Sequence, residues 1–329
     1  MIPCMIAGLG SYLPSRRVPN EELEQCFDIP PNWIERATGV VARRYAGDET
    51  TAGMAASAAR MALERAGMTV RDLDAIIGAS TAPQQAIPCT AALVQRELGA
   101  PEGQSACFDV NATCLSFMFA LQTAALLVQS GMYRSILVFS SEIGSRSLNP
   151  CEHESLVLFG DAAAAAIVTA AEPGAATGLH LARFATHSSG ADLTRILGGG
   201  TLHHPNDPAT LPEMNMFHMR GLAVFKQAAR QIEPFLNQFF ADLGWDRGEL
   251  DLVIPHQASG HAVNLLTSRL GFREDQVFIN LPERGNCIAA SIPLALAEAD
   301  QAGRLRRGQR VLLVGTGAGL TLGAVAMTY

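Results

Sequence analysis

Four short runs of apolar residues predict strands that are buried on both faces. Continuous apolar runs of this length are typical of parallel strands covered by helices. Two longer segments, 53–67 and 224–243, contain strong helix formers with an apolar side and predict helices. Together they indicate an α/β fold. The predicted strands are residues 73–78, 136–139, 252–255 and 311–314.

The order of helix, short connection and strand occurs twice along the chain. Aligning Leu73 with Leu250 gives an offset of 177 residues, and aligning Arg134 with Arg310 gives 176. Two anchors with nearly the same offset predict two similar α/β halves. These halves are residues 1–175 and 176–329, with a boundary near residues 173–178.

Two residues with reactive or polar side chains occupy matching positions in the repeat. Cys114 lies 17 residues before Gly131, and Asn286 lies 17 residues before Gly303. Each glycine ends a predicted helix, so Cys114 and Asn286 stand at the starts of corresponding helices. If the halves pack about a pseudo-twofold axis, these helix starts face each other across one site.

The composition excludes several classes of protein. Hydrophobic residues make up 48% of the 329 residues and charged residues 17%, which suits helices packed closely on a covered sheet. A net charge of −7 provides no basic surface for nucleic acid. No apolar run reaches the roughly 20 residues that cross a bilayer, and the first residues lack the pattern of a secretion signal. We therefore expect a cytoplasmic protein that binds neither nucleic acid nor membrane.

The seven cysteines are scattered, and no Cys-x-x-Cys pair occurs among them. The odd number argues against a disulfide framework, and the absence of that pair argues against structural zinc. Cys114 is the thiol with a plausible reactive setting, because the positive end of a helix dipole favours a thiolate. The alternative is that Cys114 is a small buried hydrophobic residue.

His256 and Asn286 are the candidate polar partners of this thiol. His256 directly follows the predicted strand 252–255, at the edge where α/β proteins bind ligands, although it could also be a structural histidine in a turn. Asn286 could equally be a helix N-cap. The glycine-rich run 315–323 offers bare backbone amides, but it lacks the Gly-x-Gly-x-x-Gly spacing of a dinucleotide loop.

Distant motifs in this order resemble the β-ketoacyl-acyl-carrier-protein synthase III family of the thiolase superfamily. The resemblance runs essentially from end to end of the chain and explains the internal repeat, since that fold is a duplicated α/β unit with five αβαβα layers. The motifs are GLGSYLP at 8–14, WI at 33–34, TGV at 38–40, FGD at 159–161, VFK at 224–226, PHQA at 255–258, GN at 285–286 and AASIP at 289–293.

The resemblance implies a role for each suspected residue. Cys114 attacks an acyl thioester and forms an acyl-enzyme, which suits a thiolate nucleophile. His256 and Asn286 then stabilise the enolate formed when a malonyl-type thioester loses carbon dioxide. Backbone N–H groups of Cys114 and Ala318 form the oxyanion hole.

The resemblance also implies the binding partners. They are acyl-coenzyme A or acyl-carrier-protein thioesters, with acyl carrier protein itself as a protein partner and a second copy of the chain in a homodimer. No cofactor and no metal are implied. The positions implied for substrate binding are Trp33, Ile87, Gly221, Phe225, Gly317 and Gly319.

Departures from the family pattern concern substrate delivery and leave other functions open. Ala37 and His153 replace two arginines that hold coenzyme A, and His261 replaces an arginine that docks the carrier protein. One alternative is a relative that condenses two long acyl thioesters or transfers the acyl group to an oxygen or nitrogen nucleophile. Another is a non-catalytic ketosynthase-like subunit, which would be expected to lose the nucleophile.

Overall fold

Two five-stranded sheets form the framework of the computed structural model, which describes residues 1–172 and 174–329. The first sheet has the order β2-β8-β7-β5-β6 and the second the order β1-β9-β14-β13-β12. The first comprises β2 (Met5–Tyr12), β5 (Ala75–Gly78), β6 (Ala106–Asp109), β7 (Ser135–Glu142) and β8 (Ala162–Thr169). The second comprises β1 (Ile2–Pro3), β9 (Gly178–Thr186), β12 (Leu252–Pro255), β13 (Arg310–Gly317) and β14 (Thr321–Thr328).

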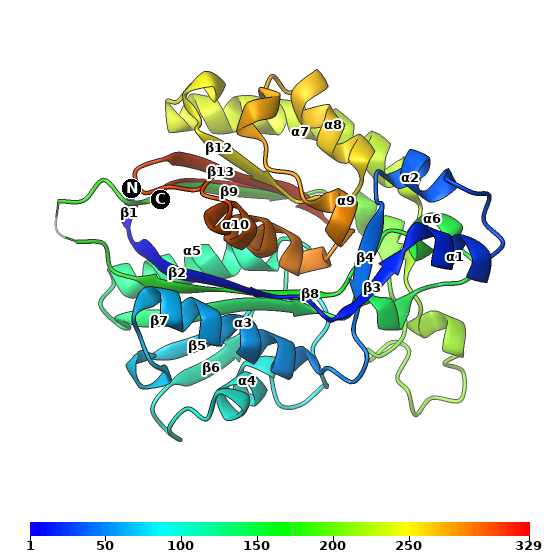
Figure 1. Ribbon diagram of the computed structural model, residues 1–329, viewed down its shortest axis with the longest axis horizontal. Helices are drawn as coiled ribbons and strands as arrows, with labels where there is room; N and C mark the ends of the chain where they lie inside the picture. The colour runs from blue at the N-terminus through cyan, green and yellow to red at the C-terminus, as the bar shows by residue number, and fades with distance from the viewer. Residues whose placement is uncertain (173) are drawn as a thin grey trace.

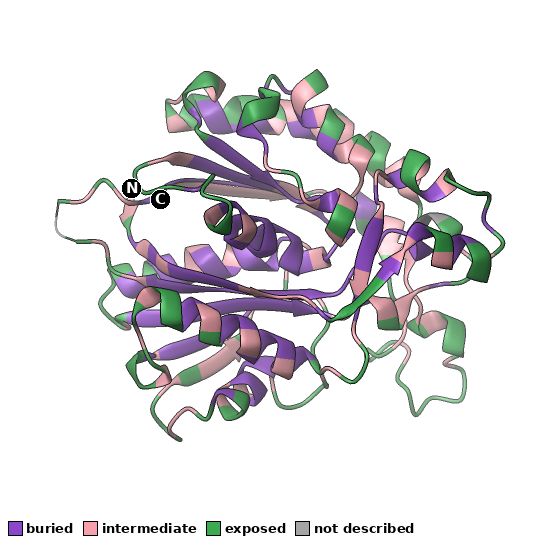
Figure 2. Cartoon of the chain, in the orientation of Figure 1, coloured by how far each residue is buried: buried purple, intermediate pink, exposed green. Residues whose placement is uncertain are grey.

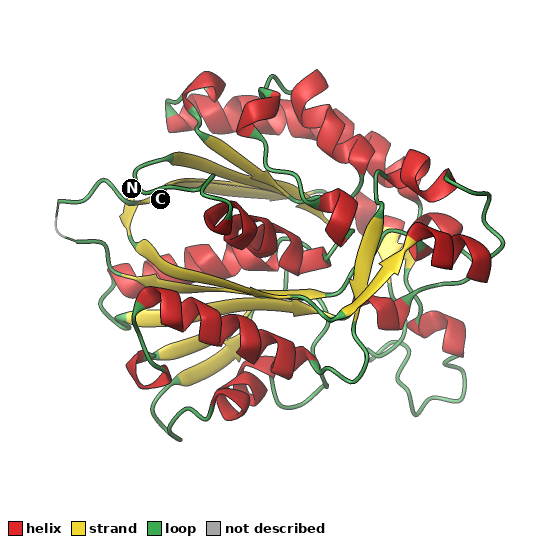
Figure 3. Ribbon diagram, in the orientation of Figure 1, coloured by secondary structure: helices red, strands yellow, loops and turns green. Residues whose placement is uncertain are grey.

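Helices cover both faces of each sheet and produce five layers (Figures 1 and 3). The two helices between the sheets are α5 (Ser116–Gln129) and α10 (Ser291–Gln301). The outer layers contain α3 (Thr51–Ala66) and α4 (Thr90–Leu98) on the first sheet, and α7 (Gly221–Leu243) and α8 (Gly260–Ser268) on the second. The predicted αβαβα arrangement is confirmed.

Smaller elements surround one end of the layers. The strands β3 (Arg16–Pro19) and β4 (Ala42–Tyr45) pair antiparallel, as do β10 (Thr194–Arg195) and β11 (His218–Met219). The short helices are α1 (Asn20–Cys26), α2 (Trp33–Thr38), α6 (His153–Leu156) and α9 (Leu281–Arg284). No helix among residues 1–172 and 174–329 is long and apolar enough to span a bilayer.

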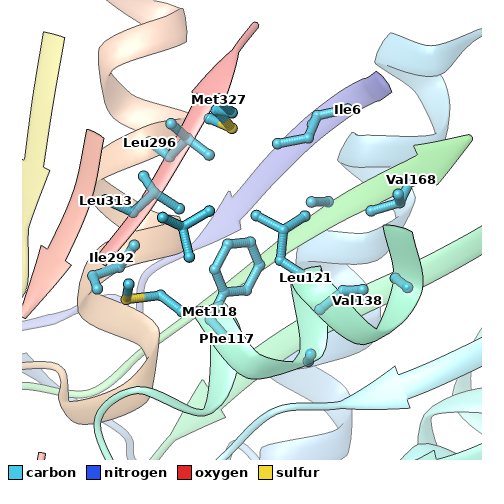
Figure 4. Packing of buried hydrophobic residues seen from close by; sticks show 14 of the residues in the cluster. Ile6, Phe117, Met118, Leu121, Val138, Val168, Ile292, Leu296, Leu313 and Met327 are labelled. Atoms are coloured by element: carbon cyan, nitrogen blue, oxygen red, sulfur yellow. The ribbon is translucent and has the colours of Figure 1, made fainter. Parts of the chain in front are cut away.

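The middle layer is the most completely buried part of the protein (Figure 2). Phe117 and Leu121 of α5 pack with Ile292 of α10, while Val138 and Leu313 reach them from the two sheets (Figure 4). A helix that is apolar on nearly all sides belongs in such a position. The middle helices therefore hold the two sheets together and fix where their own N-termini lie.

The sheets repeat one topology, with a parallel pair followed by an antiparallel pair. Ala75 pairs with Ile136 in the first sheet, and Leu252 pairs with Val311 in the second. The offset between Ala75 and Leu252 is 177, as expected from the first alignment. Ile136 and Val311 are 175 apart (311 − 136), so the predicted offset of 176 is wrong by one residue. A slip of one residue along a strand moves a side chain to the opposite face.

The predicted boundary between the halves falls on a short connection between β8 and β9. Residue 173 of that connection lies outside the described residues. The strand β1 joins the second sheet, where Ile2 pairs with Leu179. The first residues of the chain therefore pack with the half that contains the C-terminus.

Candidate active site

A cavity of about 350 Å³ lies where the carboxyl ends of the parallel strands of both sheets meet. Ligands of α/β proteins bind at such strand ends because the loops that follow the strands are free to carry functional groups. Its wall includes Cys114, Glu142, His256, Asn286 and Ala318. The structure thus brings together the residues predicted from the two halves.

Cys114 is held in place by a network around its neighbour Thr113. Thr113 has a φ of 53°, which is an unusual conformation for a β-branched residue. Its N–H donates to Asn111 Oδ1 (2.9 Å), and its carbonyl oxygen accepts from Ser116 Oγ (2.6 Å). These bonds stabilise the sharp turn that places Cys114 at the cavity, two residues before α5 begins.

The surroundings of Cys114 do not favour its thiolate in the resting protein. Burial, with a smaller contribution from the negative charge of Glu142, raises the pKa of the Cys114 thiol to about 12. Hydrogen bonds from the backbone N–H groups of Ala318 and Cys114 oppose this increase. The prediction of a thiolate stabilised by the helix start is therefore wrong, because desolvation outweighs the nearby amides.

His256 follows β12 directly, and its backbone N–H donates to Val314 O on β13 (2.7 Å). Gly315 makes room for the imidazole, since a Cβ there would lie 2.5 Å from the His256 Cβ. Burial lowers the pKa of His256 to about 4, so the imidazole is neutral near pH 7. Its Nδ1 has no hydrogen-bond partner within the part of the chain that the structure describes.

Asn286 lies in the connection between α9 and α10. Its N–H donates to Leu158 O (2.8 Å), and its carbonyl oxygen accepts from Gly160 N–H (3.1 Å). The side-chain Oδ1 accepts from Ile288 N–H (2.9 Å), which leaves Nδ2 as the donor of the amide. Because α10 begins at Ser291, Asn286 is not the N-cap of that helix.

The glycine-rich turn between β13 and β14 forms the wall beside Cys114. Gly317, Ala318 and Gly319 all line the cavity. A Cβ at Gly317 would lie 2.8 Å from Thr113 Oγ1, and Gly319 has a φ of 139°. Both positions therefore require glycine, and the backbone of Ala318 can approach the thiol closely.

The other four positions proposed for substrate binding do not line the cavity. Trp33 begins α2 and packs beside a separate apolar cluster, and Ile87 is 84% exposed in the loop before α4. Gly221 and Phe225 lie in the first turns of α7. Val224 of the same helix does reach the cavity wall, so this helix start borders the cavity.

Glu142 is a cavity residue that sequence analysis missed. It ends β7, is only 1% exposed, and lies in the cavity wall. Burial raises its pKa to about 7, while N–H groups of Thr81, Ala82 and Ala289 lower it. An acidic residue at the end of the run ILVFSSE was the available signal.

Within residues 1–172 and 174–329, no three His, Cys, Asp or Glu side chains are grouped so that they could hold a metal ion.

Comparisons with known proteins agree over the whole chain. Residues 108–190 match the family model described as 3-oxoacyl-[acyl-carrier-protein (ACP)] synthase III, and residues 240–329 match the model of its C-terminal part.

Two curated proteins and one solved structure illustrate the similarity. The chain is 38% identical over 330 residues to β-ketoacyl-[acyl-carrier-protein] synthase III 3 of Streptomyces coelicolor, covering 99% of this chain and 97% of that protein. It is 36% identical over 332 residues to the synthase III of Bartonella bacilliformis, covering 100% of both. The crystal structure of 3-oxoacyl-[acyl-carrier-protein] synthase III from Aquifex aeolicus superposes with a TM-score of 0.89 at 36% identity, covering 99% of this chain and 100% of that one.

Proposed function

Because the chain belongs to the 3-oxoacyl-[acyl-carrier-protein] synthase III family of condensing enzymes, we propose that it joins an acyl thioester to a malonyl thioester through an acyl-Cys114 intermediate. The observation that carries this proposal is the single cavity lined by Cys114, His256, Asn286 and Ala318. The two half-reactions need a thiol, two polar side chains and backbone amides, and this cavity provides all of them.

The first half-reaction transfers the acyl group to Cys114. The sulfur attacks the thioester carbonyl, and the N–H groups of Cys114 and Ala318 stabilise the oxyanion that forms. Their hydrogen bonds to the resting thiol support this assignment, since they already lie at the reacting sulfur. Collapse of the intermediate releases the thiol of the incoming carrier.

The second half-reaction needs hydrogen-bond donors to the thioester oxygen rather than a general base. When a malonyl thioester loses carbon dioxide, negative charge develops on its thioester oxygen. The neutral His256 can donate one hydrogen bond from Nε2, and Asn286 can donate another from Nδ2. The enolate then attacks the acyl-Cys114 carbonyl and the carbon–sulfur bond to Cys114 breaks, which forms the 3-oxoacyl product; the released sulfur takes up a proton from solvent and restores the resting thiol.

The remaining wall suits an apolar acyl chain. Ile143, Phe159, Leu193, Ile196 and Phe217 also line the cavity. The rings of Phe159 and Phe217 pack edge to face, with centroids 4.7 Å apart. These side chains would exclude water from the bound acyl group.

We further infer that the protein is a cytoplasmic homodimer and that acyl carrier protein delivers one substrate. The strand β6 is the outer strand of its sheet, and none of its residues is buried. Ile87 projects from a loop nearby in the chain. An uncovered edge strand with an exposed apolar residue is suited to pairing with a second copy. Sedimentation of the purified chain tests the dimer.

Intact-protein mass spectrometry tests the function directly. The wild type, Cys114→Ala and the control Cys151→Ala, which removes an exposed free thiol, are incubated with acyl-coenzyme A and acyl-carrier thioesters. We expect an acyl adduct in the wild type and in the control, its absence in Cys114→Ala, and its discharge by malonyl-carrier protein with release of carbon dioxide. An adduct that malonyl thioesters cannot discharge would indicate a different acceptor, and no adduct at all would indicate a non-catalytic subunit.

A further inference from the structure

The ribbon formed by β10 and β11, with the residues that adjoin it, lines two cavities, the one that contains Cys114 and a second one of about 230 Å³. Successive residues of a strand point to opposite faces, so each strand contributes to both cavities. On the side of Cys114 these residues are Thr194, Ile196 and Phe217, and on the side of the second cavity they are Leu197, His218 and Arg220. Leu193, Arg195 and Met219 line both cavities, and only Arg195 among them is charged.

Arg195 adds a positive charge beside the apolar side chains Leu193 and Ile196 in the wall of the Cys114 cavity. It is the one side chain in the described part of this wall that is positively charged near pH 7, since His256 is neutral there. A plain alkyl chain that covered the guanidinium would remove water from it without supplying an acceptor, which is unfavourable. An acyl chain that ends in a carboxylate would supply one.

The guanidinium of Arg195 has donors available for such a carboxylate. Its Nη1 donates to Asp192 Oδ1 (3.2 Å), whereas its Nε and Nη2 donate to no group in the part of the chain that the structure describes, Glu142 of the same cavity included. The Asp192 side chain is 85% exposed, so water weakens this ion pair. The Arg195 side chain is itself 40% exposed, which lets a bound carboxylate keep part of its hydration. The planar guanidinium can therefore bind a ligand carboxylate through two parallel hydrogen bonds.

The ribbon that carries Arg195 is held in place by contacts that do not use its guanidinium. In the wall of the second cavity, Glu152 Oε1 lies 2.6 Å from His218 Nδ1, and Glu152 Oε2 accepts the N–H of Met219 (3.1 Å). Both oxygens of this carboxylate are thus engaged, and they connect β11 to the residue that precedes α6. Arg220 lines the same cavity and adds a second positive charge on that side of the ribbon.

We propose that Arg195 binds the distal carboxylate of the acyl chain and makes the protein selective for monothioesters of dicarboxylic acids. The proposal rests on the proposed function, since it names the acyl group that Cys114 receives. The covalent step is that of any acyl thioester: the bond from the Cys114 sulfur to the carbonyl carbon forms, the carbon–sulfur bond to the carrier breaks, and the carrier leaves as a thiol with the proton that Cys114 loses. The distal carboxylate stays ionised and does not react.

Matched acyl-coenzyme A thioesters test the proposal. The members of a pair have the same number of carbon atoms and differ only in ending in a carboxylate or in a methyl group: glutaryl and pentanoyl, adipoyl and hexanoyl, suberoyl and octanoyl. Rapid quenching followed by intact-protein mass spectrometry gives the rate constant for acylation of Cys114 by each thioester. We expect the carboxylate member of at least one pair to react about 10-fold faster, because hydrogen bonds between charged groups are strong.

Three variants separate the guanidinium from its surroundings. In Arg195→Met the ratio of the two rates should fall by about 10-fold, because the apolar stem remains and the charged donors are lost. Asp192→Asn should keep or increase the preference, because it removes the competing carboxylate. Arg273→Met is the matched control, since Arg273 also forms an exposed ion pair with a nearby aspartate, Asp275 (3.0 Å), but lines neither cavity. Its ratio should equal that of the wild type.

Four results would overturn the proposal. The first is a wild type that shows no preference for the carboxylate member of any pair. The second is an unchanged ratio in Arg195→Met, whether or not both rates fall, which would indicate a structural role or a contact with coenzyme A. The third is an equal loss of preference in Asp192→Asn and Arg195→Met, which would assign the effect to their ion pair.

The fourth result concerns the condensation step. Slower discharge of a preformed pentanoyl-Cys114 adduct by malonyl-carrier protein in Arg195→Met would assign the guanidinium to the malonyl carboxylate instead. The proposed function fails separately, if none of the thioesters acylates the wild type. Acylation by the methyl-ended members alone, followed by discharge with malonyl-carrier protein, would support the proposed function and refute the role of Arg195.

Discussion

The hydroxyl of Thr113 lies 3.3 Å from the carbonyl oxygen of Ala318 and donates toward it, which connects the segment carrying Cys114 to the glycine-rich turn of the other half. The same hydroxyl lies 2.8 Å from Ala112 O. One hydroxyl proton is therefore shared between an acceptor in the local turn and an acceptor in the other half of the chain. This contact holds the carbonyl of Ala318, and the backbone N–H of the same residue lowers the pKa of the Cys114 thiol.

Removing this hydroxyl should weaken catalysis without unfolding the protein. Thr113→Val keeps the shape of the side chain but loses the hydrogen bond to Ala318. A bond of this kind contributes about 0.5–1.5 kcal/mol, so kcat/KM should fall about 2- to 13-fold. Thr113→Ser should retain most of the activity. Equal losses in the two variants would show that the methyl group, and not the hydroxyl, positions the turn.

Adding a side chain at Gly317 should lower stability and activity more than adding one at a glycine that is surrounded by open space. In Gly317→Ala the new Cβ would lie 2.8 Å from Thr113 Oγ1 and 3.3 Å from Leu115 Cγ. Overpacking of this kind costs about 1–3 kcal/mol and would displace the neighbouring Ala318 amide. We expect a lower melting temperature and slower acylation of Cys114. Gly200→Ala meets no atom within 4 Å and serves as the control; equal effects in both variants would contradict the prediction.

The middle layer should dominate stability. Leu121 of α5 is fully buried between the sheets, whereas Leu126 of the same helix is 47% exposed. Leu121→Ala should lower the free energy of unfolding by about 2–5 kcal/mol, and Leu126→Ala should lower it by much less. Urea unfolding monitored by circular dichroism measures both. Similar values would indicate that α5 is not packed as described.

The buried His256 should make stability decrease in acid. Its pKa is about 4 in the folded protein against 6.5 as the ordinary value, so the unfolded chain binds the extra proton first as the pH falls. The free energy of unfolding should therefore fall by ~3 kcal/mol between pH 6.5 and pH 4 because of this group. In His256→Asn that contribution is absent.

The wild type must be compared with the variant because Glu142 changes the free energy of unfolding with pH in the opposite direction. Its pKa is raised from 4.5 to about 7 in the folded protein, so its contribution to stability is lost as the pH increases through this range. The difference between the wild type and His256→Asn removes that contribution. Unfolding curves whose difference does not vary between pH 4 and pH 6.5 would show that His256 is not buried as a neutral ring.

The short-range sequence pattern was sufficient to predict most of the helices and strands considered above. The helix predicted for 53–67 is α3 (Thr51–Ala66), which ends at Gly67, and the run 252–255 coincides with β12. Helix propensity, a glycine with positive φ and a continuous apolar run act within a few residues, so they can be read from the chain itself. The internal repeat predicted two similar α/β units, although one alignment was shifted by a residue because register depends on strand pairing.

The residues that meet at the cavity were also predicted, because Cys114, His256 and Asn286 follow recognisable strand ends or precede recognisable helices. What the sequence could not provide is the degree of burial of each group. The expected thiolate at Cys114 rested on a local helix start, whereas desolvation by burial raises the pKa of this thiol. The same holds for Glu142, which is enclosed by Thr81 and Ala289 from segments about 60 and 150 residues away.

The amino-acid sequence by itself therefore determined the elements, their repetition and the residue types at the site, because these follow from short-range patterns. The tertiary structure decided the protonation states of those residues, which of them share one cavity, and that a carboxyl group joins them. Desolvation and packing depend on every segment that surrounds a group, and those segments come together only when both halves have folded against the middle helices.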